Sequence, residues 1–88
     1  MPLEYDPAKA EANLKKHDVS FADAVGVLQD PLALTVEDPE ARGEPRFVSI
    51  GLGNAGDLLV VVCSERAGAF RLISARRATR KERKQYES

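Results

Sequence analysis

Residues 46–77 read RFVSIGLGNAGDLLVVVCSERAGAFRLISARR, and this stretch decides the fold. Side chains over 46–52 alternate between two sets, as the two faces of a strand do. Residues 58–63 are continuously apolar, which is typical of a central strand covered on both sides. A last strand follows at 70–77, and the turns between the strands are expected at 54–57 and 65–68. Consecutive strands joined by tight turns predict an antiparallel meander.

Two helices are expected before this sheet. Asp6 can cap a helix that begins at Pro7 and ends near His17, because proline suits the first turn and aspartate accepts the free backbone N–H groups. Ser20 can cap a second helix, whose apolar residues recur at helical spacing. These residues are Phe21, Ala24, Val25 and Leu28.

The remaining elements complete the expected order. A strand at 32–37 and a polar loop at 38–45 lead into the meander, and a short first strand at 3–5 is an additional option. Thr79 and Glu82 have the spacing of a capping box, which predicts a short C-terminal helix ending near Tyr86. The sequence therefore predicts one α+β domain over 1–88: two N-terminal helices, an antiparallel sheet of three to four strands and a C-terminal helix.

The composition is that of a small protein with a modest core. The chain has 88 residues, of which 43% are hydrophobic and 31% charged. A domain of this size is marginal alone, so a partner or a homodimer would help it. The N-terminus lacks a basic segment followed by an apolar one, and residues 58–63 are too few to span a bilayer. We expect a cytoplasmic protein without a membrane partner, and a buried thiol rather than a nucleophile at Cys63.

Charge is distributed unevenly along the chain. Residues 71–88 carry seven basic side chains against Glu82 and Glu87, whereas residues 18–44 carry seven acidic side chains against Arg42. A basic end beside an acidic middle indicates a site for a polyanion. A solvated helix face crossed by ion pairs would give the same pattern.

Several kinds of active site have no counterpart in the sequence. Glycine-rich phosphate loops and nucleophile elbows are absent, and one histidine with one cysteine cannot form a zinc cluster. We expect no metal and no cofactor. The remaining bases and cations suit metal-free RNA cleavage, in which the 2′-hydroxyl of the RNA is the nucleophile. The protein then needs only acid–base groups and fixed cations.

Arg76 is the leading candidate for holding a phosphate, because arginine forms paired hydrogen bonds. Alternation in the last strand places it on one face with Phe70, Leu72 and Ser74. Core neighbours on that face would hold its guanidinium rigidly. The alternative is a strand-end arginine paired with an acidic loop.

Lys16, His17 and the C-terminal helix supply further candidates. Histidine titrates near neutral pH and suits proton transfer, although a histidine in a last helical turn is more often a packing group. Tyr86 can stack on a base or simply pack onto the sheet. Three cations would lie on one side of the C-terminal helix and could contact RNA or an acidic partner: Arg80, Arg83 and Lys84.

Segments along nearly the whole chain resemble the BrnT toxin family. The most specific are Asn13-Leu14-Lys15-Lys16-His17 and Ile73-Ser74-Ala75-Arg76-Arg77-Ala78. The others are 4–9, 19–21, Asp30-Pro31, 44–46 with Gly51, Thr79, Glu82-Arg83 and Tyr86.

The resemblance implies a RelE-like fold and a ribonuclease that halts translation. It also implies a BrnA-like antitoxin with a ribbon–helix–helix part, and operator DNA bound only through the toxin–antitoxin complex. By position, the family's recurrent polar residues correspond to Lys16, His17, Arg46, Arg76, Glu82 and Arg83. Arg76 and Arg46 would hold the phosphate, and Lys16 or His17 would move protons. Glu82 and Ser74 would have supporting roles.

The chain departs from the family pattern at a few positions. Asp18 stands where glycine is usual after Lys-His, at a helix C-terminus that favours positive φ. Tyr5 replaces a tryptophan, and Cys63 replaces an aromatic residue or histidine. These departures keep a second function open, in which a weak or inactive relative serves as a binding module in an autorepressing complex. A purely structural domain is the third reading.

Overall fold

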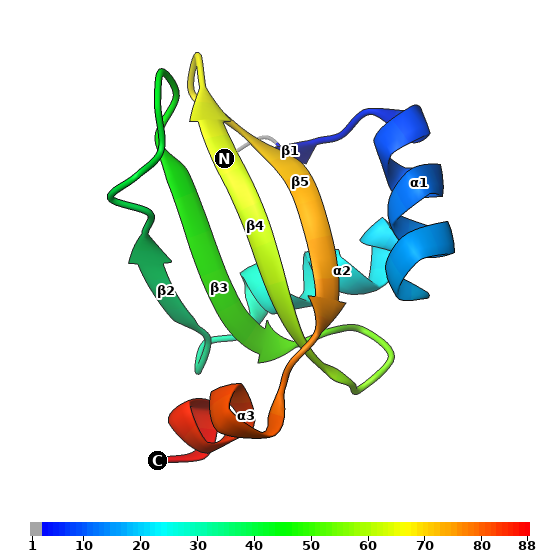
Figure 1. The fold of residues 1–88 in the computed structure, drawn as a ribbon, viewed down its shortest axis with the longest axis vertical. Coiled ribbons are helices and arrows are strands. Elements are labelled where there is room, and N and C mark those ends of the chain that lie inside the picture. The colour runs from blue at the N-terminus through cyan, green and yellow to red at the C-terminus, as the bar shows by residue number, and fades with distance from the viewer. Residues whose placement is uncertain (1–2) are drawn as a thin grey trace.

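The computed structural model describes residues 3–88, which form three helices and one five-stranded sheet (Figure 1). The elements are β1 (Leu3–Glu4), α1 (Pro7–His17), α2 (Phe21–Gln29), β2 (Leu34–Glu37), β3 (Arg46–Leu52), β4 (Leu58–Arg66), β5 (Ala69–Arg77) and α3 (Arg80–Glu87). The expected α+β class and the order of elements are confirmed.

The sheet has the strand order β1-β5-β4-β3-β2. The strands β2 to β5 form the expected antiparallel meander, with β4 at its centre. The expectation of a purely antiparallel sheet of three to four strands is wrong, because β1 adds a fifth strand parallel to β5. Such a short strand carries little pattern of its own, so its pairing depends on the position of β5 rather than on local sequence.

The hairpin between β4 and β5 is tighter than expected. Its turn consists of Ala67 and Gly68 alone, both with positive φ, at 52° and 80°. Two residues with positive φ match the twist of the flanking strands. Glu65 and Arg66 therefore extend β4 instead of forming part of the turn.

The helix ends follow the capping residues identified in the sequence. The Asp6 carboxylate accepts a hydrogen bond from Ala8 N at 2.9 Å, and Ser20 Oγ accepts one from Asp23 N at 3.1 Å. Helix α1 ends at Asp18, whose φ of 56° is the left-handed conformation expected at this position. Thr79 and Glu82 form the complete capping box of α3.

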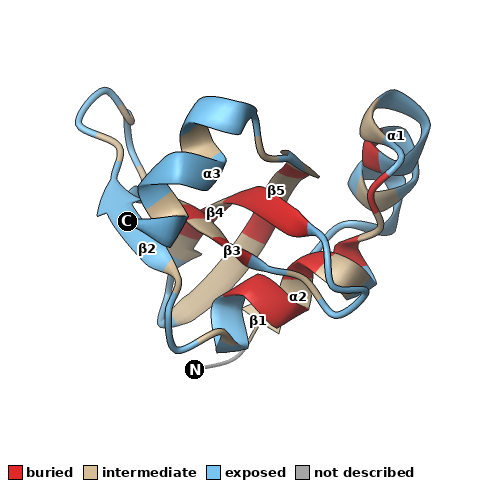
Figure 2. Cartoon of the chain, turned by 90° about the horizontal axis from the view of Figure 1, so that it is seen from below, coloured by how far each residue is buried: buried red, intermediate tan, exposed pale blue. Residues whose placement is uncertain are grey.

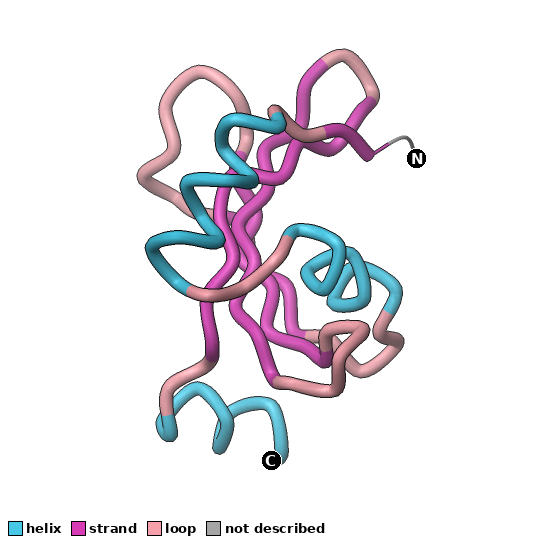
Figure 3. The backbone as a smooth tube through the Cα atoms, turned by 90° about the vertical axis from the view of Figure 1, so that its right-hand side faces the viewer, coloured by secondary structure: helices cyan, strands magenta, loops and turns pink. Residues whose placement is uncertain are grey.

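The three helices lie on different sides of the sheet (Figures 2 and 3). Helix α2 covers one face, called here the α2 face, and encloses the core with β4 and β5. On the opposite face, called the open face, α3 lies near one end of β3 (Figure 2). The buried core residues are Val19, Phe21, Ala24, Val27, Leu59, Val61, Cys63, Leu72 and Ala75.

Asn13 attaches α1 to the edge of β5. Its side-chain amide accepts a hydrogen bond from Ala75 N at 3.0 Å and donates to Ala75 O at 2.9 Å. It also donates to Val19 O at 2.9 Å. The amide thus replaces a neighbouring strand at a point where β1 does not reach.

A β-bulge in β5 changes which residues share a face with Arg76. Val62 pairs with Ser74 and Cys63 pairs with Leu72, so Ile73 is an extra residue. The expectation that Leu72 and Phe70 lie on the face of Arg76 is therefore wrong. Leu72 and Phe70 point into the core, while Ser74 and Arg76 lie on the open face.

Candidate nucleic-acid site

Arg76 is held in place by Glu82 at the end of β5 where α3 begins. Its Nη1 and Nη2 donate to the two oxygens of Glu82, each at 2.8 Å, and Nη1 also donates to Arg77 O at 3.3 Å. Glu82 accepts a further hydrogen bond from Thr79 N at 2.8 Å. The capping box therefore fixes the carboxylate, and the carboxylate fixes the plane of the guanidinium.

The Arg76–Glu82 pair is stable over a wide pH range. The hydrogen bonds from Arg76, followed by those from Thr79, lower the pKa of Glu82 to about 2. The same contact raises the pKa of Arg76. At neutral pH Glu82 is consequently an anchor for the arginine and a poor proton acceptor.

Arg76 keeps the capacity to bind a phosphate. Of the five N–H donors of a guanidinium, three serve Glu82 and Arg77, which leaves two with no acceptor among residues 3–88. The side chain is 42% exposed, so a ligand can reach it from the open face. The sequence identified this residue but did not identify Glu82 as its direct partner.

Lys16 and His17 lie in the last turn of α1, close to the end of β5. Arg77 Nη1 lies 3.5 Å from Asp18 O, and this contact joins the two chain segments. Lys16 is exposed and His17 is half-buried. The contact therefore brings the end of α1 to the end of β5 through Asp18 and Arg77. No hydrogen bond or ion pair among residues 3–88 joins Lys16 or His17 to Arg76.

Arg46 does not belong to this group. It begins β3 and aligns with Ser64 of β4, whereas Arg76 aligns with Val60. Because Ser64 and Val60 are four residues apart in β4, Arg46 and Arg76 are separated by about 13 Å along the strand direction. Arg46 and Arg76 thus lie on the same face at opposite ends of the meander, because β3 begins at one end of the sheet and β5 ends at the other.

Helix α3 has one side chain that anchors it to the rest of the chain and several exposed cations. The Tyr86 hydroxyl donates to Asp30 Oδ2 at 2.6 Å, which lowers the pKa of Asp30 and raises that of Tyr86. Tyr86 therefore anchors α3 to the end of α2 through its hydroxyl. The three cations expected on one side of this helix, Arg80, Arg83 and Lys84, are all exposed.

The sequence of the chain matches the model of a known protein family. The model for the ribonuclease toxin BrnT of type II toxin–antitoxin systems matches residues 5–82. The chain belongs to the BrnT family. A crystal structure of the Brucella abortus ribonuclease toxin BrnT has a similar fold, with a TM-score of 0.68 and 24% identity over 91% of this chain and 99% of that one. No curated protein matches the chain.

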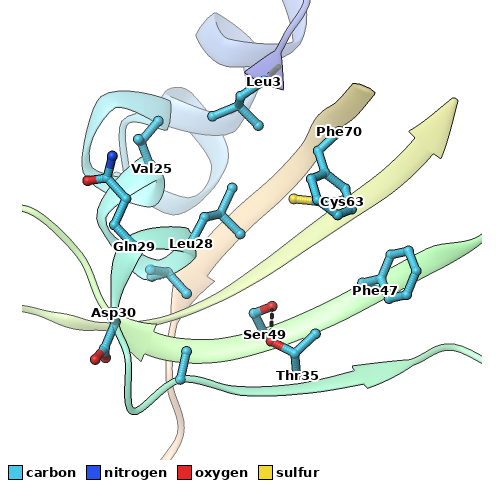
Figure 4. Close-up of a pocket in the computed structure, with 12 residues that line it drawn as sticks. Leu3, Val25, Leu28, Gln29, Asp30, Thr35, Phe47, Ser49, Cys63 and Phe70 are labelled. Carbon is cyan, nitrogen blue, oxygen red and sulfur yellow. Dashed lines mark hydrogen bonds between the residues drawn. The ribbon is translucent and has the colours of Figure 1, made fainter. Parts of the chain in front are cut away.

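The α2 face of this BrnT-family chain contains a cavity. The cavity, of about 540 Å³, opens between α2 and the sheet, and its lining includes Leu28, Phe47 and Cys63 (Figure 4). Cys63 is buried, as expected, and burial raises the pKa of its thiol to about 11. The lining contains no lysine, arginine or histidine from residues 3–88, so the cavity does not suit a polyanion.

Within the described part of the chain, no helix is long and apolar enough to cross a bilayer. Within the same residues, no three histidine, cysteine or acidic side chains group as metal ligands would.

Proposed function

We propose that this chain is the toxin of a type II toxin–antitoxin system and cleaves RNA without a metal, within a RelE-like fold. The observation that carries the proposal is Arg76, which Glu82 orients and which is 42% exposed with two N–H donors that have no acceptor among residues 3–88. Membership of a ribonuclease toxin family supports RNA as the substrate.

The proposed reaction assigns phosphate binding to Arg76 and proton transfer to Lys16 or His17. The 2′-oxygen of the RNA forms a bond to phosphorus, the bond to the 5′-oxygen breaks, and the products carry a 2′,3′-cyclic phosphate and a 5′-hydroxyl. Arg76 binds the phosphate oxygens on which negative charge develops. Lys16 or His17 takes the proton from the 2′-hydroxyl or supplies one to the 5′-oxygen.

RNA cleavage by purified protein tests the proposal. The wild type should cut RNA in EDTA and leave cyclic or 3′-phosphate ends, and cutting that requires Mg²⁺ would exclude the mechanism. Arg76→Ala should lose at least tenfold in rate, because one charge-assisted donor pair contributes about 2–4 kcal/mol to a transition state. Arg66→Ala is the matched control, since Arg66 also ends a strand in an ion pair with one glutamate, at 3.5 Å.

Inhibition of translation and neutralisation by a BrnA-like antitoxin complete the proposal. The exposed cations of α3 provide a surface for an acidic antitoxin segment or for flanking RNA. Expression in the cytoplasm should arrest growth, and co-expression of the neighbouring antitoxin should restore it. Harmless expression of a folded wild type would instead favour a binding module in an autorepressing complex.

A further inference from the structure

A second basic pocket lies on the open face, at the far end of the sheet from Arg76. It has a volume of about 140 Å³ and gathers side chains from α1, the loop before β3 and three neighbouring strands. Its lining includes Lys9, Arg42, Glu44, Arg46, Ser64 and Arg71. Among these residues only Arg46 was expected in the catalytic site, and Arg71 was expected only as part of the basic stretch 71–88.

Positive charge exceeds negative charge in this pocket by a wide margin. Four basic side chains face one carboxylate, that of Glu44, which Arg66 contacts at 3.5 Å from outside the lining. Arg71 is contacted by Glu4 at 3.4 Å. Within residues 3–88, no carboxylate lies within 4.0 Å of the charged nitrogens of Lys9, Arg42 or Arg46.

The tertiary structure holds these cations together. Lys9 is one turn before Asn13 on the same side of α1, and Asn13 is hydrogen-bonded to the edge of β5. The open face presents Arg46 and Arg71 on either side of Ser64, with which both are in register. An anionic ligand would offset the repulsion between these cations, which the fold holds at one place.

We propose that this pocket binds a backbone phosphate of the RNA other than the one that is cleaved. The proposal rests on the proposed function for the identity of the strand. The pocket lies about 13 Å along the sheet from the level of Arg76, so one single strand crossing the open face reaches both. Lys9, Arg46 and Arg71 contact phosphate oxygens, and the Ser64 hydroxyl is a neutral donor beside them.

The size and donors of the pocket favour a phosphate over an acidic protein segment. A volume of about 140 Å³ accepts a compact anionic group and excludes a folded element. Two arginine forks and a lysine around one such group match the oxygens of a phosphate. A carboxylate-rich peptide is the competing ligand that the test must separate.

Binding of an uncleavable strand tests the pocket without relying on catalysis. The probe is a short labelled 2′-O-methyl RNA, which lacks the attacking hydroxyl, and anisotropy is measured at several salt concentrations. Lys9→Ala removes one phosphate contact, so log K against log salt should become shallower by about 0.7, with about fivefold weaker binding near 0.1 M salt. Lys9→Arg should retain binding.

Lys15→Ala is the matched control, because it removes the same charge from the same helix. Lys15 is 77% exposed and pairs with Glu11 at 3.2 Å, outside the pocket. Equal effects of Lys9→Ala and Lys15→Ala would show diffuse attraction and overturn the proposal. Unchanged RNA binding by Lys9→Ala, with weakened binding of a glutamate-rich peptide, would also overturn it in favour of the acidic ligand.

The two proposals can fail separately. If the wild type binds the probe through Lys9 but never cleaves ordinary RNA, the proposed function is wrong and the phosphate pocket stands. If the wild type cleaves RNA while Lys9→Ala binds the probe as Lys15→Ala does, the pocket is wrong and the function stands. Unfolding curves that match the wild type establish that each variant is folded.

Discussion

Replacing Asn13 by alanine should remove a large part of the stability of this domain. The amide serves three backbone groups, namely Ala75 N–H, Ala75 C=O and Val19 C=O. Ala75 is 0% exposed and Val19 is 3% exposed, so bulk water does not reach these backbone groups in the native protein. Each buried group left without a partner costs about 1–3 kcal/mol, which gives a total of at least about 3 kcal/mol.

This loss is large compared with the total stability. A chain of this length has a free energy of unfolding of about 4–13 kcal/mol. A loss of about 3 kcal/mol corresponds to a decrease in Tm of at least about 12 °C. Asn13→Asp has nearly the same shape, but it should also destabilise strongly, because a carboxylate cannot donate to the two carbonyl oxygens.

Urea unfolding followed by circular dichroism measures the effect. The matched control is Asn54→Ala, because Asn54 is exposed and its side chain donates one hydrogen bond, to Ala22 O at 2.9 Å. The control should cost about 1 kcal/mol. If Asn13→Ala cost no more than Asn54→Ala, the argument that this amide replaces a strand at the edge of β5 would be refuted.

Two further predictions concern the stability at acid pH and the hairpin between β4 and β5. The pKa of Glu82 is lowered from 4.5 to about 2, so its contribution to stability is complete above pH 4.5 and is lost as pH falls toward 2. Glu82→Gln, which removes the charge that pairs with Arg76, should flatten the decline of the urea midpoint in that window, and an unchanged decline would contradict this. Ala67→Asn should raise the free energy of unfolding by up to about 1 kcal/mol, because asparagine tolerates the φ of 52° better than alanine. Ala55→Asn, in an exposed turn without positive φ, should give no such gain.

The sequence predicted the helices well because helix ends depend on nearby residues. Asp6 with Pro7, and Thr79 with Glu82, act on backbone groups within one turn of the chain. The strands of the meander were equally readable from alternation and from the apolar run that became β4. In contrast, β1 is two residues long, and its pairing with β5 depends on a segment more than sixty residues away.

Sequence patterns identified only part of the candidate site. Arg76 stood out by residue type and position, and the structure adds that Glu82 orients it. Alternation alone placed Leu72 on the face of Arg76, because a bulge at Ile73 leaves no mark in the apolar pattern. Lys9 and Arg71 stood out only as cations, Arg71 within the basic stretch 71–88, and nothing in the sequence placed them in one pocket with Arg46.

Local chemistry in the sequence therefore determined where the helices and most strands begin and end, and which cations can hold a phosphate. Tertiary structure alone decided the register of β4 and β5, the attachment of α1 through Asn13, and the separation of Arg46 from Arg76. The physical reason is the distance along the chain over which each interaction acts. Capping and alternation act between neighbours in the chain, whereas a shared face or a pocket depends on the pairing of segments whose positions only the folded sheet establishes.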